Sequence, residues 1–173
     1  GNFRTFYEAT DEKHRTMVNT YLKKTDIAIV LTPKLKELFK DLLPEGNIRV
    51  VSNGINAENK LPDKVVKNKI EGIKAKKKMR ILYLSNMKKT KGYMKLLQSA
   101  PLLVQEGIAI EMVFAGAFES EGDKKEFNGY IEKHNLASSV RYLGVVTGGE
   151  KNKLLETSDV FVLPTTYPQE GQP

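Results

Sequence analysis

Short apolar runs alternate with longer, helix-like segments along the 173-residue chain, and this alternation limits the folds that it can adopt. The runs are largely continuous, which is typical of strands covered on both faces. Strands that alternate with helices along a chain form parallel sheets. The pattern therefore predicts an α/β fold, a parallel sheet with helices on both faces. The expected strands are 27–31, 48–51, 80–85, 109–115, 140–143 and 159–163.

The segments between these runs favour helices. Thr32 followed by Pro33 is typical of a helix start, because Thr caps helices well and Pro fits the first turn. Pro101 predicts a bend or a late break in its helix, and Asp123 is well placed to cap the next one. Residues 64–75 have helical propensity but a weak apolar stripe. The other expected helices are 7–25, 32–42, 91–105, 123–134 and 150–157.

Two absences exclude whole classes of protein. The chain has no Cys, which excludes a disulfide scaffold, a Cys zinc site and a Cys nucleophile, and favours a reducing compartment. No apolar run approaches the roughly 18 to 20 residues of a membrane span, and residues 1–4 carry no signal pattern. We therefore expect a cytoplasmic protein. The start without Met also suggests a piece of a longer chain.

Positive charge is concentrated in one stretch, although the whole chain carries a net charge of +7. Such a stretch could bind nucleic-acid phosphates, but it contains no aromatic residue on which bases could stack. A solvated linker between domains is the better interpretation, so we expect no nucleic-acid partner. Only Asp63 and Glu71 oppose its basic residues, which are Lys60, Lys64, Lys67, Lys69, Lys74, Lys76, Lys77, Lys78 and Arg80.

Four loops follow the carboxyl ends of the expected strands, which is where parallel α/β sheets bind ligands. Loop 86–92 leads into a helix, and helix N-termini favour anions. Lys91 and Gly92 lie at this helix start, with Lys88 and Lys89 nearby. The loop could hold a diphosphate, and a solvated, Lys-rich turn is the alternative. The other three loops are 116–122, 144–149 and 164–173.

The remaining chemical signals are weaker. Glu119, Glu121 and Asp123 alternate in one loop and could hold a hard cation, but no D-x-D pair occurs and we expect no metal site. His14 lies on a polar helix, and His134 lies near a helix C-terminus, where a cation suits the helix dipole. Both are expected to be structural or solvent-facing.

Five motifs in order carry a resemblance to a known family. They are Val51-Ser52-Asn53-Gly54-Ile55; Ile81 to Leu84 followed by Lys91-Gly92; Phe114-Ala115-Gly116; Val140 to Val145 with Leu143-Gly144; and Val162-Leu163-Pro164 followed by Glu170-Gly171-Gln172-Pro173. From about Asp26 to its end, the chain resembles the family-4 (group 1) retaining glycosyltransferases. The resemblance implies the GT-B architecture, in which two Rossmann-like domains face each other.

The resemblance also divides the chain. Residues 1–55 would be the C-terminal part of the N-terminal, acceptor-binding domain, and residues 56–79 a basic linker at the crossover. Residues 80–173 would form most of the nucleotide-sugar domain, a Rossmann-like parallel sheet truncated at its C-terminus. We therefore expect a fragment with little or no transferase activity of its own, because neither reactant could be positioned.

In that family a Lys before Gly grips the donor diphosphate, which assigns this role to Lys91. The family has Arg five residues earlier, where this chain has Asn86. Either phosphate binding would rest on Lys91 with Lys88 or Lys89, or the role of position 86 would differ. Glu170 matches the first of two family Glu residues and would contact the donor sugar. Lys91 and Glu170 are thus the implied catalytic residues. The implied donor-binding residues are Asn86, Lys91, Gly92, Gly116, Gly144, Val145, Glu170, Gly171 and Gln172.

The implied activity is transfer of a hexosyl group from a nucleotide-diphosphate sugar to an acceptor, with retention and without a metal or other cofactor. The lysine and the helix N-terminus would stabilise the departing diphosphate. The implied acceptor is a sugar or lipid-linked molecule bound by the N-terminal domain, in cell-surface polysaccharide or glycoconjugate synthesis. Peripheral membrane contact of the whole protein is a further expectation. A non-catalytic nucleotide- or phosphate-binding module of the same fold is the alternative.

Overall fold

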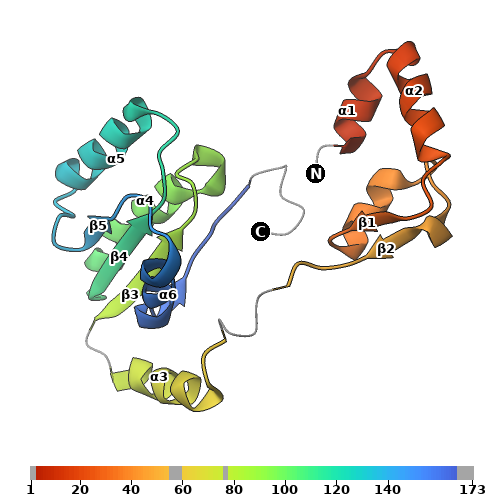
Figure 1. Ribbon diagram of the computed structural model, residues 1–173. Coiled ribbons are helices and arrows are strands. Elements are labelled where there is room, and N and C mark those ends of the chain that lie inside the picture. Colours follow the sequence, from red (N-terminus) through yellow and green to blue (C-terminus); the bar gives the residue numbers. More distant parts are fainter. Residues whose placement is uncertain (1–2, 55–59, 76–77, 167–173) are drawn as a thin grey trace. The chain divides into compact units, whose positions relative to one another are not determined.

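The computed structural model describes residues 3–54, 60–75 and 78–166, which fall into two compact units (Figure 1). The first unit consists of residues 3–54 and the second of the remainder. All six expected strands are present, and each pairing between them is parallel. The predicted α/β fold is therefore confirmed. Within the part of the chain described, no helix combines the length and apolar character that a bilayer crossing requires.

The first unit holds a two-stranded parallel sheet, in which Ala28 lies opposite Ile48. Its small core consists of the buried side chains of Val30, Leu43 and Ile48. Two helices precede the sheet, and two 3₁₀ helices connect its strands. The elements are α1 (Phe3–Ala9), α2 (Glu12–Leu22), β1 (Ala28–Val30), η1 (Pro33–Phe39), η2 (Glu45–Asn47) and β2 (Ile48–Val50).

The helix expected over residues 7–25 is two helices, α1 and α2. Asp11 caps α2, because its carboxylate accepts a hydrogen bond from the backbone N–H of His14 at 3.0 Å. A capping residue has extended rather than helical geometry, so the expected helix is interrupted there. The helix expected after Thr32 is the 3₁₀ helix η1, and the Thr32 side chain makes no capping hydrogen bond.

The second unit is built on a four-stranded sheet with the spatial order β5-β4-β3-β6. The chain moves outward from β3 through β4 to β5 and then crosses back to add β6 on the other side of β3. This reversal leaves a crevice at the carboxyl ends of β3 and β6, where such sheets bind ligands. The elements are α3 (Asp63–Ala75), β3 (Met79–Leu84), η4 (Lys89–Lys91), α4 (Tyr93–Gln105), β4 (Ile110–Ala115), α5 (Glu121–Lys133), β5 (Val140–Tyr142), α6 (Gly148–Thr157) and β6 (Val160–Phe161).

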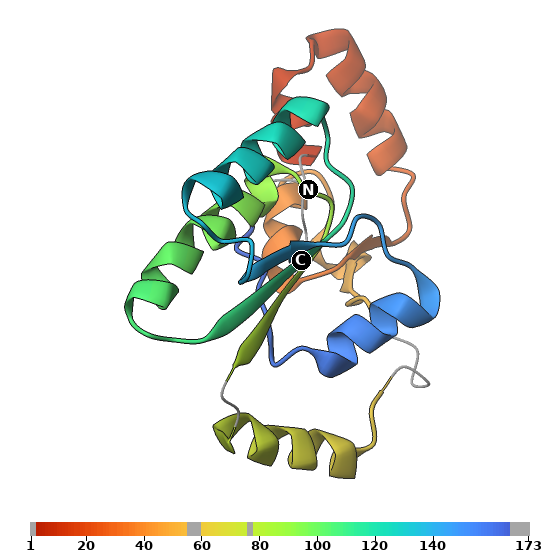
Figure 2. The same cartoon turned by 90° about the vertical axis from the view of Figure 1, so that its left-hand side faces the viewer.

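Helices lie on both faces of this sheet (Figure 2). Helices α4 and α5 pack on one face, and α6 lies on the other. The main core lies under α4 and α5, where the rings of Tyr83, Tyr93, Phe114 and Phe127 are fully buried and contact one another. Such tilted and edge-on ring contacts add to the stabilisation from burial. The core therefore fixes the ends of β3 and β4 and the loops that follow them.

The starts of α4 and α5 differ from expectation. Helix α4 begins at Tyr93 rather than at Lys91, because the 3₁₀ turn η4 precedes it, and it continues through Pro101 to Gln105. Helix α5 is capped by Ser120 and not by Asp123, since the Ser120 hydroxyl oxygen accepts a hydrogen bond from the backbone N–H of Asp123 at 3.1 Å. Ser is as good a cap as Asp, so the choice depends on where the preceding loop ends.

Helix α3 occupies most of the basic stretch that was expected to be a linker. Its helical propensity is thus realised over Asp63–Ala75. The Lys69 ammonium group donates a hydrogen bond to the backbone carbonyl of Glu156, near the end of α6. This bond links α3 to α6 within the second unit.

Candidate functional site

Two segments that are distant in sequence meet at the crevice between β3 and β6. The backbone N–H of Thr166 donates to the carbonyl oxygen of Thr90 at 2.7 Å, and the Thr166 hydroxyl donates to the same oxygen at 3.2 Å. Close by, a β-carbon on Gly92 would overlap the carbonyl oxygen of Pro164. The segment after β6 is therefore seated on the turn that carries Lys91.

Gly92 is required at this junction for two reasons. It is buried with a φ of +83°, which side chains other than glycine rarely adopt. Only glycine also leaves room for the backbone of Pro164. Gly92 is the N-cap of α4, and Lys91, which is half-buried, comes directly before it. The turn thus places a lysine beside the free backbone N–H groups of a helix N-terminus, a combination that suits a phosphate.

A cavity of about 160 Å³ opens at the carboxyl ends of the strands, beside this crevice. It is lined by three of the predicted donor-binding residues, Asn86, Gly116 and Val145. A fourth, Gly144, accepts a hydrogen bond at its carbonyl from the backbone N–H of Gly116 at 2.8 Å. The structure therefore brings these four residues together. The complete lining is Leu84, Ser85, Asn86, Ala115, Gly116, Ala117, Val145 and Val146.

Gly116 holds the ends of β3 and β4 close together at this cavity. Its φ is +145°, and a β-carbon there would overlap the carbonyl oxygen of Ser85. The Tyr142 hydroxyl donates to the Gly116 carbonyl at 2.8 Å, and the backbone N–H of Met87 donates to the carbonyl of Ala117, also at 2.8 Å. Backbone contacts thus set the shape of the cavity wall.

Asn86 occupies the position at which the family that this chain resembles has Arg. It is exposed, and its carbonyl accepts a hydrogen bond from the buried Tyr83 hydroxyl at 3.0 Å, which anchors its backbone. An amide side chain can donate and accept hydrogen bonds but carries no charge. Any positive charge that this loop offers to a ligand must therefore come from its lysines.

Two of those lysines are engaged with α5 and the residues before it. The Lys88 ammonium lies 2.7 Å from a Glu119 carboxylate oxygen. The Lys89 ammonium lies 2.7 Å from Glu126 and 3.6 Å from Asp123. The hydrogen bond that Lys89 donates to Glu126 and the negative charge of Glu126 raise the pKa of Lys89, with a further contribution from the charge of Asp123. These ion pairs could not be predicted from the local sequence, because the partners come from another segment.

The same contacts account for two of the three acids considered for a metal. Glu119 and Asp123 face lysines, and Asp123 also accepts a hydrogen bond from the Ser120 hydroxyl at 2.7 Å. In residues 3–54, 60–75 and 78–166, no group of three or more His, Cys, Asp or Glu side chains could hold a metal ion. Metal-independence remains a prediction.

Both histidines have local structural contacts. The Nδ1 atom of His14 lies 2.6 Å from a carboxylate oxygen of Asp11, at the start of α2. His134 follows the last turn of α5, where its ring stacks on Tyr130 with centroids 4.2 Å apart. These contacts agree with the structural assignment expected for each.

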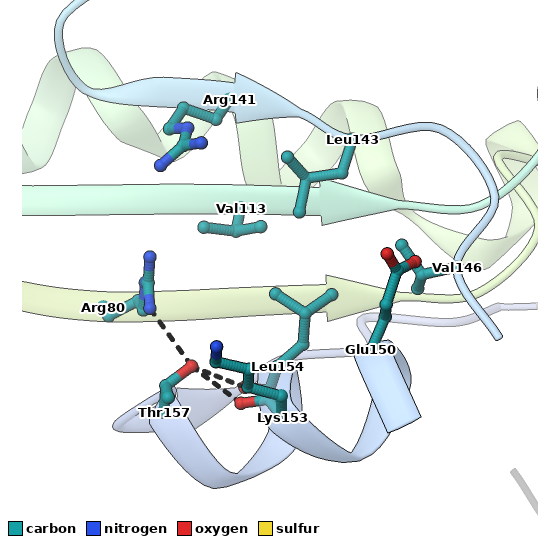
Figure 3. Close-up of a pocket in the computed structure, with 9 residues that line it drawn as sticks. All are labelled: Arg80, Val113, Arg141, Leu143, Val146, Glu150, Lys153, Leu154 and Thr157. Carbon is teal, nitrogen blue, oxygen red and sulfur yellow. Dashed lines mark hydrogen bonds between the residues drawn. The ribbon is translucent and has the colours of Figure 1, made fainter. Parts of the chain in front are cut away.

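A second cavity, of about 460 Å³, was not predicted from the sequence. It lies between α6 and the sheet face opposite the main core (Figure 3). Its floor includes apolar side chains, and charged side chains surround them. The charged residues within the apolar strands could have indicated this cavity. The sequence does not show, however, which residues pair across neighbouring strands. The lining residues are Arg80, Val113, Arg141, Leu143, Val146, Glu150, Lys153, Leu154 and Thr157.

An ion network crosses the sheet beside this second cavity. The Nε atom of Arg80 lies 3.1 Å from Glu111, and Arg141 contacts the same carboxylate at 3.2 Å. Arg80 also donates to the Thr157 hydroxyl at 3.1 Å, which links β3 to the end of α6. Burial raises the pKa of Glu111, but the hydrogen bonds and charges of the two arginines outweigh it, so the pKa is lowered overall.

The predicted residues Glu170, Gly171 and Gln172 lie outside the described residues. Their assigned contacts with the donor sugar remain predictions. What the structure does describe is the end of β6 and residues 162–166 after it, which bring the chain to the crevice.

Comparison with known sequences supports the resemblance. A family model described as "Glycosyl transferases group 1" matches residues 65–173. A glycosyltransferase of Methanocaldococcus jannaschii, itself described as uncharacterized, is 28% identical over 154 residues, which cover 83% of this chain and 37% of the relative. This chain therefore spans little more than a third of the length of that relative.

Solved structures of GT-B glycosyltransferases share the fold. A mutant of S. aureus TarM, in complex with UDP, fondaparinux and α-GlcNAc-glycerol, matches with a TM-score of 0.67 and 22% identity, over 96% of this chain and 30% of TarM. Anabaena HepE, in complex with UDP and glucose, has a TM-score of 0.62 and 15% identity, over 87% and 43%. A glycosyltransferase from Rickettsia africae has a TM-score of 0.69 and 17% identity, over 92% and 43%. At these identities the likeness shows the fold alone.

Proposed function

The chain belongs to the group 1 glycosyl transferases, and we propose that its second unit binds the diphosphate of a nucleotide-sugar donor at the crevice between β3 and β6. The junction of Gly92 with Pro164 is the observation that carries this proposal. It holds Lys91 and the N-terminus of α4 at the place where the strand order reverses. A cation next to unsatisfied backbone N–H groups attracts and orients a diphosphate.

We assign the nucleoside part of the donor to the neighbouring cavity of about 160 Å³. Its walls are backbone and small or apolar side chains of Gly116, Ala117 and Val145, so backbone groups would recognise the base. The TarM and HepE structures both contain UDP. Because these proteins share the fold of this chain, a UDP-sugar is the first donor to test.

Group transfer needs stabilisation of the leaving diphosphate. The bond from the sugar C1 atom to the diphosphate oxygen breaks, and a bond from C1 to the acceptor hydroxyl oxygen forms. The hydroxyl proton passes to the departing diphosphate oxygen, so the products are the glycosylated acceptor and the nucleoside diphosphate. Negative charge develops on the diphosphate, where the Lys91 ammonium and the first N–H groups of α4 would stabilise it. A hydrogen bond to a charged group contributes about 1.5 to 3 kcal/mol, so we propose that no metal is needed.

We assign Glu170 to the sugar rather than to the nucleotide. Its carboxylate would accept hydrogen bonds from sugar hydroxyls once the segment after β6 passes the crevice. Glycosidases place two carboxylates across the scissile bond, and this loop offers one, which favours transfer over hydrolysis. We also propose that the enzyme is a family-4 glycosyltransferase, that its donor carries a hexosyl group, and that transfer retains the configuration at C1.

The activity of the whole protein extends the proposal beyond this chain. The first unit would belong to the acceptor-binding domain, and a sugar or lipid-linked molecule would be the acceptor. Synthesis of a cell-surface polysaccharide or glycoconjugate in the cytoplasm, with peripheral contact to the membrane, is consistent with such acceptors. The second unit alone would bind the donor but transfer little.

A non-catalytic nucleotide-binding module is the second candidate. The observation in its favour is Asn86, which brings no charge to the position where the family carries Arg. A module of this kind would bind a nucleoside diphosphate and its sugar conjugates equally well. It would not release a sugar to any acceptor.

A nucleotide-sugar screen on the whole protein separates these candidates. Affinities for UDP, GDP and ADP and for their glucose and N-acetylglucosamine conjugates would be measured by calorimetry, with and without EDTA. Saturable binding of one nucleotide that EDTA does not change supports the donor site. Release of the nucleoside diphosphate on adding acceptor, with NMR assignment of the product anomer, supports transfer with retention. Nucleotide binding without any release favours the module, and no nucleotide binding would exclude both.

A further inference from the structure

The loop 86–92 is attached to the rest of the second unit on two sides. On one side, Thr90 and Gly92 contact the segment after β6. On the other side, Lys88 reaches Glu119 at 2.7 Å and Lys89 reaches Glu126 at 2.7 Å. Lys88 and Lys89 are therefore both held by carboxylates on the α5 side of the loop.

The contacts on the α5 side depend on the N-terminal cap of α5, which is Ser120. The Ser120 hydroxyl both accepts from the backbone N–H of Asp123 and donates to its carboxylate, which fixes Asp123 in the first turn of α5. Asp123 then lies 3.6 Å from the Lys89 ammonium, and Glu126 follows one turn later on the same helix. Capping and the ion pairs thus reinforce each other.

The net charge of this cluster decides what it can bind. Two ammonium groups, of Lys88 and Lys89, face the three carboxylates of Glu119, Asp123 and Glu126. The cluster is therefore negative overall and repels a diphosphate. To bind phosphate, either lysine would have to leave a carboxylate at hydrogen-bonding distance.

We infer that Lys88 and Lys89 are positioning residues, which hold the loop against α5 so that Lys91 and the N-terminus of α4 are presented to the donor. This inference rests on the proposed donor site and revises the expectation that either lysine supplements Lys91 at the phosphates. Each of the two ion pairs is partly exposed, so their effect comes from acting together on one short loop.

A charge swap in the whole protein tests the inference. The variants are Lys89→Glu, Glu126→Lys and the double variant, in which Lys at 126 can also pair with Asp123 at i,i+3. Lys125→Glu is the matched control, because it makes the same charge change at an exposed position on α5. The readouts are UDP affinity by calorimetry and, without nucleotide, hydrogen exchange of residues 86–92.

We expect Lys89→Glu to weaken UDP binding roughly three- to tenfold and to speed exchange in the loop, while the control changes neither. The double variant should return both readouts to within about twofold of the unaltered protein. A loss of UDP binding that the swap does not restore would show that Lys89 contacts the phosphates. Unchanged hydrogen exchange of residues 86–92 in Lys89→Glu would show that Lys89 does not hold the loop against α5. If the unaltered protein binds no nucleotide, the proposed donor site is wrong. The hydrogen-exchange data then test by themselves whether Lys89 holds the loop against α5.

Discussion

The carbonyl oxygen of Pro164 occupies the space that a β-carbon on Gly92 would need. Because Gly92 ends the turn that carries Lys91 and Pro164 follows β6, this contact limits how closely the two walls of the crevice approach, and the hydrogen bonds from Thr166 to Thr90 hold them together. Any larger residue at position 92 must move one wall.

Gly92→Ala should therefore destabilise the second unit and weaken nucleotide binding. The substitution adds a clash with backbone and places Ala at a φ of +83°, which together cost about 2 kcal/mol. Gly129→Ala is the control: it lies inside α5 with open space around it, so it should raise stability by about 1 kcal/mol. Urea unfolding of both variants measures the difference. Equal stability of the two variants would mean that the junction is not rigid.

Lys91→Ala should lower nucleoside diphosphate affinity in the whole protein. Loss of a charge-assisted hydrogen bond costs about 1.5 to 3 kcal/mol, which is roughly ten- to a hundredfold. The loss should be the same for different sugars on one nucleotide, because the diphosphate is common to all. Lys133→Ala, an exposed position at the end of α5, is the control. Calorimetry with UDP and two UDP-sugars checks this, and unchanged affinity would remove Lys91 from the site.

Glu170→Gln should abolish most transfer while leaving UDP affinity within about twofold. The amide keeps the size of the side chain and one acceptor oxygen but loses the charge that sugar hydroxyls would contact, and a mismatched polar partner is costly. Transfer rate and affinity for bare UDP would be measured on the same preparation. A parallel fall in both would instead place Glu170 at the phosphates or in support of the loop.

Tyr93→Phe should leave the second unit as stable or raise its stability by up to about 1 kcal/mol. The Tyr93 hydroxyl is buried without a hydrogen-bond partner among the described residues, and this burial, together with the charge of Asp123, raises its pKa to about 12. Tyr83→Phe is the matched control. Its equally buried hydroxyl donates to Asn86, so its loss should cost about 1 kcal/mol. Urea unfolding that ranks the two variants the other way would contradict this account.

Glu111→Gln should cost about 1 to 2 kcal/mol at neutral pH and progressively less in acid. The pKa of Glu111 in the folded protein lies below the usual 4.5, so its contribution is complete above that value and is lost as the pH falls through the folded pKa. Unfolding free energies at pH 7 and pH 3 test this. The gap between the unaltered protein and the variant should shrink on acidification, whereas Glu132→Gln, at an exposed position, should show no gap at either pH.

The strands were predictable because each is a short, largely apolar run, and most of these runs end at a polar or glycine residue. Helix boundaries were harder, since two good caps can stand close together. Ser120 and Asp123 are three residues apart, and Ser120 is the N-cap in the structure. At Asp11 a capping residue interrupts a segment whose spacing favoured one helix.

Parts of the candidate site could be proposed from the sequence for a similar local reason. A Lys-Gly pair between a strand and a helix identifies Lys91 and Gly92 without knowledge of the rest of the fold. The ion pair of Lys89 with Glu126 was not predictable, because it joins residues 37 apart and depends on how α5 lies on the sheet. The network of Arg80 and Glu111 likewise depends on strand register, in which the two are directly paired.

The strand order also determines when the crevice forms during synthesis of the protein. β3 and β4 are successive strands and can pair as soon as both have left the ribosome, since closing a short loop costs little entropy. The carbonyl of Thr90 cannot accept its hydrogen bonds from Thr166 until that residue, 76 positions further along the chain, has been synthesised. We expect a nascent chain that ends before β6 to have a folded β3–β4 core and an exposed, unoccupied edge on β3. Such a chain carries Lys91 but lacks the second wall of the crevice, because Pro164 and Thr166 have not yet been added.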